Sequence, residues 1–240
     1  MVYAPGVIRN GEGRQGLLDE DIADYDYQKS EEFLKAGIRT YRILAIIKLE
    51  EIVVNKKKLS LPEAIEENII DENFHPVVEI RSFGTKARID DLGSYFHQDI
   101  KEMKLLVNDA IKLVSQELGC EKPISEKEYL MWFAKMLGFS VGLMHKNGWF
   151  HNYLSPHNIT LDCRIADLDS VSQLTDKREQ EKDLEWARFS LDELLNFFHI
   201  IDSQEREVFE KQLQKNYDSV FPPKERERYF NELKQSKQKR

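Results

Sequence analysis

The chain has few cysteines, no long apolar run and no excess of positive charge. Cys120 and Cys163 are the two cysteines among 240 residues and lie far apart, so we expect reduced thiols rather than a disulfide or a zinc site. No apolar run approaches the roughly 20 residues that a helix needs to cross a bilayer. The formal net charge of -8 argues against a nucleic-acid-binding protein.

The amino terminus has neither the basic start nor the apolar core of a secretory signal. With so few cysteines, this predicts a cytoplasmic protein with no membrane and no nucleic-acid partner. The composition, 32% charged and 41% hydrophobic, is ordinary for a soluble globular protein. A chain of this length forms one or two domains.

The stretch Gly148–Val171 carries the strongest functional signal. Two short apolar runs flank Asp162-Cys163 and predict a hairpin that holds Asn158 and Asp167 close together at its two ends. An amide oxygen and a carboxylate placed in this way suit a hard divalent cation that also holds nucleotide phosphates. The alternative is a buried hairpin in which Asn158 and Asp167 are only turn residues.

This layout resembles the catalytic loop of a protein kinase followed by its metal-binding aspartate. In the pattern H-R-D-L-x-x-x-N, the matching residues are His151, Leu154 and Asn158, and Asp167 stands for the aspartate of D-F-G. Tyr153 occupies the place of the catalytic aspartate. A tyrosine with its ordinary pKa of about 10 cannot serve as a carboxylate base at neutral pH. The resemblance implies a kinase fold that keeps its metal ligands and lacks the usual base.

The two halves of the chain differ in their hydrophobic pattern. Apolar runs at Thr40–Val54 and Pro76–Arg81 predict strands in the first half. The second half has apolar residues at helical spacing, and Ser125-x-x-Glu128 is a capping box that opens one helix.

We therefore expect an α+β protein with a bilobal, kinase-like fold. A truncated N-lobe would occupy residues 1–90, and a mainly helical C-lobe would occupy residues 91–240. The catalytic-loop-like hairpin, at residues 151–170, would belong to the second lobe.

Several motifs, taken in order, resemble the selenoprotein O family of pseudokinase-fold adenylyltransferases. Gly11-Glu12-Gly13-Arg14 is similar to the family's G-D-G-R turn, and Gly37–Arg42 is similar to its G-I-P-T-T-R segment. Arg81 and Arg88 are seven residues apart, as are two arginines of the family. Each feature also has a purely structural explanation. The glycine-rich segment would be an ordinary turn around Asn10-Gly11, and the two arginines would form surface ion pairs.

The catalytic segments also agree in length. The family reads H-G-V-M-N-T-D-N where this chain has His151 to Asn158, and in both the metal aspartate follows nine residues after the asparagine. The resemblance implies that Asn158 and Asp167 bind Mg²⁺ or Mn²⁺ with ATP. It also implies an inverted nucleotide whose phosphates are neutralised by Arg14, Arg81 and Arg88.

The chain departs from the family at three points. The family's nucleotide-binding lysine lies just upstream of the G-D-G-R turn, and we expect this chain to lack it because Met1 is too close to the turn. The helix acid that pairs with this lysine falls on Asp26, with Glu31 as a second candidate. The aspartate before the metal asparagine is His157 here, which either acts as the base at a pKa near 6.5 or is simply packed in the loop.

Three functions remain open. The first is an ATP-dependent nucleotidyltransferase that moves AMP to protein hydroxyl groups, and the second is a catalytically inactive pseudokinase that acts as a binding scaffold. The third is a small-molecule kinase, since the helix around Asp183–Trp186 resembles those of aminoglycoside and lipopolysaccharide kinases. Tyr153 argues against the third, because such kinases need the missing aspartate as a base. The sequence indicates neither the target nor the oligomeric state.

Overall fold

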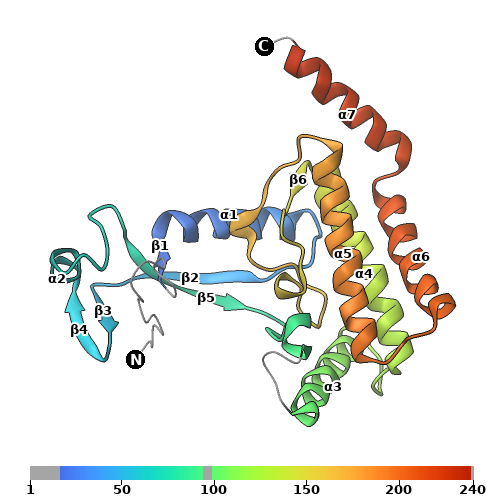
Figure 1. Ribbon diagram of the computed structural model, residues 1–240, viewed down its shortest axis with the longest axis horizontal. Coiled ribbons are helices and arrows are strands. Elements are labelled where there is room, and N and C mark those ends of the chain that lie inside the picture. The colour runs from blue at the N-terminus through green and yellow to red at the C-terminus, as the bar shows by residue number, and fades with distance from the viewer. Residues whose placement is uncertain (1–16, 94–98, 239–240) are drawn as a thin grey trace. The chain divides into compact units, whose positions relative to one another are not determined.

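The computed structural model describes residues 17–93 and 99–238 and divides the chain into two compact units (Figure 1). The first unit comprises Met1–Lys29 and Arg42–Ser82, and the second comprises Ser30–Tyr41 and Phe83–Arg240. The expected α+β class is confirmed: the first unit contains small antiparallel sheets, and the second is mainly helical. No helix among the described residues is long and apolar enough to span a membrane.

A three-stranded antiparallel sheet organises the first unit. Its strands are β1 (Leu18–Asp19), β5 (Pro76–Ser82) and β2 (Arg42–Lys48), in that order across the sheet. Helix α1 (Glu20–Lys35) follows β1 directly and begins in this unit. In β5, Glu79 and Arg81 lie opposite Ile46 and Ile43 of β2. Because residues two apart in a strand share a face, these four side chains lie on the same side of the sheet.

A small hairpin and helix are inserted between β2 and β5. Strands β3 (Glu51–Val54) and β4 (Lys57–Ser60) are joined by Asn55 and Lys56, which have φ values of 49° and 67°. Two left-handed residues in a two-residue loop are the signature of a tight hairpin turn. The run Thr40–Val54 is therefore two strands that belong to different sheets. Helix α2 (Leu61–Glu66) follows and is opened by a capping box on Ser60.

Helices dominate the second unit. They are α3 (Ile100–Glu117), α4 (Glu126–Lys146), α5 (Lys177–Phe197), α6 (Ser203–Val220) and α7 (Pro223–Gln238). The capping box that opens α4 at Ser125 is present as expected. Figure 1 shows α4, α5 and α6 running side by side.

Glycines on α4 allow α6 to approach closely. A Cβ atom on Gly138 would lie 2.1 Å from the carbonyl oxygen of Leu213, and one on Gly142 would lie 3.0 Å from Cβ of Val220. Both glycines are buried. The absence of a side chain is therefore what allows the two helices to pack at this distance, although glycine costs about 1 kcal/mol in helix propensity.

The expected hairpin around Asp162-Cys163 is present in the second unit. Ile159 and Ile165 form an antiparallel bridge, and the N–H of Ala166 donates to the carbonyl of Asn158 at 2.8 Å. Further bridges join Thr160 to Arg88 and Ile165 to Thr40. Strands β6 (Trp149–Phe150) and β7 (Ser172–Gln173) pair on either side of this segment.

Candidate functional site

A buried carboxylate on α5 holds the start of the kinase-like loop. Asp183 is fully buried, and its two oxygens accept the backbone N–H groups of His151 at 2.9 Å and Asn152 at 3.0 Å. Asn152 has a φ of 72°, a left-handed conformation that asparagine adopts more readily than most residues. The carboxylate therefore fixes the path of the backbone at the point where the loop turns.

The same carboxylate belongs to a larger buried network. Nε2 of His145 lies 3.2 Å from Asp183, and its Nδ1 lies 2.9 Å from the hydroxyl of Tyr217 on α6. Tyr217 also accepts a hydrogen bond from the side chain of Gln180. Polar groups buried in this way are stable only when all are paired, so α4, α5 and α6 together support the loop.

His151 connects the loop to the segment before Asp167. Its Nε2 is 2.8 Å from the carbonyl oxygen of Ala166, so this nitrogen carries the proton and donates it. Nδ1 then accepts the N–H of Tyr153 at 3.3 Å. Burial lowers the pKa of His151 below its ordinary value, which keeps the ring neutral. His151 is thus a positioning residue in this structure.

Asn158 and Asp167 lie at the two ends of the hairpin. The amide nitrogen of Asn158 donates to the carbonyl of Tyr153 at 2.8 Å, so the amide oxygen remains as the group that a cation would use. The backbone of Asn158 bonds to Ala166, the residue before Asp167. Asp167 has a φ of 55°, a left-handed conformation that aspartate adopts more readily than most residues.

Arg88 forms a two-point ion pair with Asp167. Nη1 lies 3.1 Å from Oδ2 and Nη2 lies 3.2 Å from Oδ1, and the two side chains are 31% and 36% exposed. The backbone N–H of Arg88 donates to Asp91 at 2.8 Å, and its strand-like segment pairs with Thr160 of the hairpin. The carboxylate of Asp167, the amide of Asn158 and the guanidinium of Arg88 therefore come from segments that are joined by backbone pairing.

The donor set at this hairpin fits a magnesium-like cation. Mg²⁺ binds one or two protein oxygens together with waters and substrate phosphates, and Asn158 and Asp167 supply an amide oxygen and a carboxylate. No group of three His, Cys, Asp or Glu side chains suited to a metal occurs among the described residues. A cation held by Asn158 and Asp167 would take its other ligands from water or from a bound group.

A base candidate of the loop lies beside a carboxylate from another segment. Nδ1 of His157 is 3.1 Å from Oδ2 of Asp90, and the two side chains are 59% and 30% exposed. Asp90 belongs to a short 3₁₀ helix, Ile89–Leu92, whose first N–H donates to the carbonyl of Ile159 in the hairpin. A histidine oriented by a carboxylate is the usual arrangement of a general base. Sequence reasoning missed Asp90, because nothing in its neighbourhood marks it.

The first unit contains a separate ionic cluster. Arg81 contacts Asp26 at 2.7 Å and also pairs with Glu79. Asp26 is 1% exposed, and the side chain of Glu79 is 3% exposed. Burial raises the pKa of Glu79 to about 7, and the nearby Asp26 adds to this while Arg81 opposes it.

The remaining predicted residues are dispersed. Asp26, the expected acid of the helix, has Arg81 as its partner. Glu31 lies further along α1, in the second unit, and on another face, since five residues turn a helix about 140° past a full turn. Arg81 and Arg88 belong to different units, so their common role stays a prediction. Arg14 and the glycine-rich turn lie outside the described residues.

Comparisons with known proteins assign no family. No protein-family model matches the chain, and no curated protein matches it. Among solved structures, the chain is similar to one described as WaaP in complex with acyl carrier protein, with a TM-score of 0.37 and 14% identity over 83% of this chain and 76% of that one. Similarity at this level indicates neither a ligand nor an activity.

Proposed function

We propose that the chain is an ATP- and divalent-cation-dependent group-transfer protein that resembles the protein adenylyltransferases of kinase-like fold. The Arg88–Asp167 pair carries the proposal, at 3.1 and 3.2 Å and beside Asn158. Nucleotide phosphates and a cation need a guanidinium, a carboxylate and an amide oxygen in one site. The hairpin supplies the carboxylate and the amide, and the segment that pairs with it at Thr160 supplies the guanidinium of Arg88.

In this proposal the nucleotide binds through its phosphates. Asn158 and Asp167 would hold Mg²⁺ or Mn²⁺, which when bound neutralises phosphate charge. Arg88 would then move from Asp167 to a phosphate oxygen, since a guanidinium binds phosphate as well as carboxylate. Transfer of this kind depends mainly on positioning and electrostatic stabilisation, and it therefore tolerates the loss of the usual aspartate base at Tyr153.

His157 is the proposed base, and its contact with Asp90 supports this role. The proton of the acceptor hydroxyl passes to His157 as the hydroxyl oxygen bonds to the α-phosphorus of ATP. The bond from that phosphorus to the bridging oxygen breaks, and pyrophosphate leaves. Asp90 would orient the imidazole and stabilise its protonated form, as carboxylates do beside catalytic histidines.

Label transfer from ATP tests this proposal. ATP labelled at the α-phosphate labels an acceptor protein only if AMP is transferred, whereas label at the γ-phosphate marks a kinase. We expect α-label transfer, with loss in Asp167→Ala and retention in Asp169→Ala, an exposed carboxylate two residues away. Transfer of γ-label alone would contradict the adenylyl assignment and favour a small-molecule or protein kinase.

One observation favours the scaffold function as a second candidate. Arg88 already pairs with both oxygens of Asp167, so the carboxylate is neutralised without a metal. If calorimetry detects no binding of magnesium- or manganese-ATP at millimolar concentration, and neither label is transferred, the chain is a pseudokinase scaffold.

A further inference from the structure

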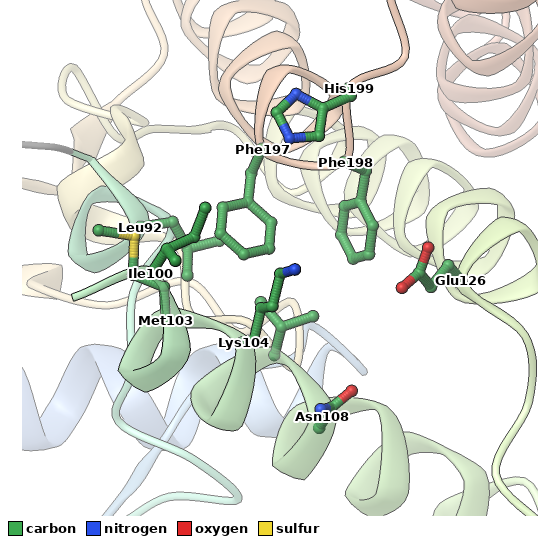
Figure 2. A pocket seen from close by; sticks show the side chains of 10 residues that line it. Leu92, Ile100, Met103, Lys104, Asn108, Glu126, Phe197, Phe198 and His199 are labelled. Atoms are coloured by element: carbon green, nitrogen blue, oxygen red, sulfur yellow. The ribbon is translucent and has the colours of Figure 1, made fainter.

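A pocket of about 660 Å³ lies in the second unit, between α3, the start of α4 and the end of α5 (Figure 2). Its walls are mainly apolar and include Leu92, Met103, Val107, Phe197 and Phe198. Small-molecule sites typically measure about 300–1,000 Å³ and are lined in this way. Arg81, Arg88, Asn158 and Asp167 do not line this pocket.

Lys104, an exposed residue of α3, is the lysine among the residues that line the pocket, where Asn108, Glu126 and His199 are the other polar groups. Figure 2 shows its side chain extending from α3 toward the space beside the rings of Phe197 and Phe198. The positions three and four residues away on α3 hold no Asp or Glu, and Lys104 forms no ion pair with the residues that the structure describes. On the same helix, Lys112 does pair with Asp109 at 3.0 Å.

The acidic residue of the pocket has a local structural role. Glu126 is the first residue of α4, where the helix dipole stabilises a negative charge. Lys104 lies in the second turn of α3, where a positive charge gains nothing from the dipole. The positive charge of Lys104 is therefore balanced neither by a helix dipole nor by an ion-pair partner among the described residues.

We propose that this pocket binds a small amphipathic anion. A ring or chain of the ligand would pack against Phe197 and Phe198, and one carboxylate, sulfonate or phosphate would pair with Lys104. Six of the ten residues that line the pocket are apolar, so a ligand without an apolar part would lose more hydration there than it regains. This proposal is independent of the nucleotide-binding proposal.

The pocket shares two wall residues with a smaller one that reaches Asp90. Leu92 and Phe197 line a second, smaller pocket of about 110 Å³ together with Asp90 and Pro156. Leu92 and Phe197 therefore separate a ligand in the larger pocket from the smaller pocket, whose lining includes Asp90, the partner of His157. Its binding should shift the imidazole NMR signals of His199, which lines the larger pocket, and of His157, but not those of His75 in the first unit.

Two fluorescent probes with the same ring system test the charge requirement. Anilinonaphthalene sulfonate carries an anion, and N-phenyl-1-naphthylamine is its neutral counterpart. We expect the full chain to bind the sulfonate about three to ten times more tightly, the range for a partly exposed charged contact. Lys104→Met should abolish this preference while keeping the neutral probe's affinity, and Lys101→Met should change neither.

Two exposed apolar residues of α3 provide a matched test of location. Ile100 lines the pocket and Leu105 does not, and they are 55% and 62% exposed. Ile100→Glu places a repelling charge at the first position of α3, which favours an acidic residue, and should weaken sulfonate binding at least threefold. Leu105→Glu should leave it unchanged. Absence of probe binding, insensitivity to Lys104→Met, or equal losses in the two glutamate variants would overturn the proposal.

Discussion

Arg88 and Asp167 come from segments 79 residues apart, and both oxygens of the carboxylate face the two terminal nitrogens of the guanidinium. The oxygens that would bind a cation are therefore already paired with a positive charge of the chain itself. Because both side chains are about one-third exposed, small ions and phosphates can reach them. Any divalent cation that binds Asp167 must compete with Arg88.

Replacing Arg88 should have opposite effects on two ligands. In Arg88→Ala the carboxylate of Asp167 loses the guanidinium that competes with a cation, so affinity for Mn²⁺ alone should rise by up to about fivefold, the scale of an exposed ion pair. Affinity for manganese-ATP should fall, because a phosphate contact is lost. Calorimetry of both titrations, with the exposed Arg178→Ala as control, measures this. A fall in Mn²⁺ affinity would contradict it.

Asp183→Asn should loosen the loop and lower stability. The amide cannot accept from both His151 and Asn152, because one of its two polar atoms is a donor. A buried N–H left without an acceptor costs about 1–3 kcal/mol, and urea denaturation should register a loss of this size. Glu185→Gln, an exposed change on the same helix, should cost less than about 0.5 kcal/mol. Equal stability of the two variants would show that the carboxylate is dispensable.

Glu79 should make stability depend on pH. Its pKa is about 7 in the folded chain against 4.5 for an ordinary glutamate, so between these values the folded state binds more protons than the unfolded state. Stability is therefore full at low pH and falls as pH rises toward 7. Asp26 and Arg81 are the charged groups that contact it. Urea midpoints at pH 5 to 8 should decline more steeply in wild type than in Glu79→Gln, and parallel curves would refute this.

The two buried glycines of α4 should respond differently to a methyl group. Alanine improves helix propensity by about 1 kcal/mol at either position. At Gly138 the new Cβ would lie 2.1 Å from a backbone oxygen of α6, whereas at Gly142 the nearest atom is 3.0 Å away and belongs to a side chain. Gly138→Ala should therefore destabilise by about 2 kcal/mol or more, and Gly142→Ala by less. Thermal unfolding of both proteins gives the comparison.

The sequence predicted those features that local patterns encode. The hairpin and the capping box at Ser125 depend on residues within about ten positions of one another, so the α+β class and these elements could be expected. The division of Thr40–Val54 into β2 and β3 could not be expected, because it depends on the pairing of β3 with β4. Lys57 and Lys58 lie in β4, since Asn55 and Lys56 complete the turn.

The partners of the candidate site residues were not predictable. Asp26 and Arg81 are 55 residues apart, and Asp90 reaches His157 from a different segment. Such contacts depend on how strands and helices pack, and no periodicity records them. The roles of Arg81, Arg88, His157, Asn158 and Asp167 in nucleotide chemistry stay predictions.

The side chains that hold the backbone of the kinase-like loop are different from the side chains that the loop exposes. Asp183, His145 and His151, which hold the backbone, are fully buried, whereas Tyr153 is 53% exposed and the side chain of His157 is 59% exposed. Substitutions at the exposed positions should therefore leave the backbone of the loop in place, whereas substitutions at the buried positions should disturb it. The buried network holds the backbone of the loop, and the exposed side chains can be replaced. Tyr153→Asp is therefore a practical starting point for engineering a carboxylate base into this fold.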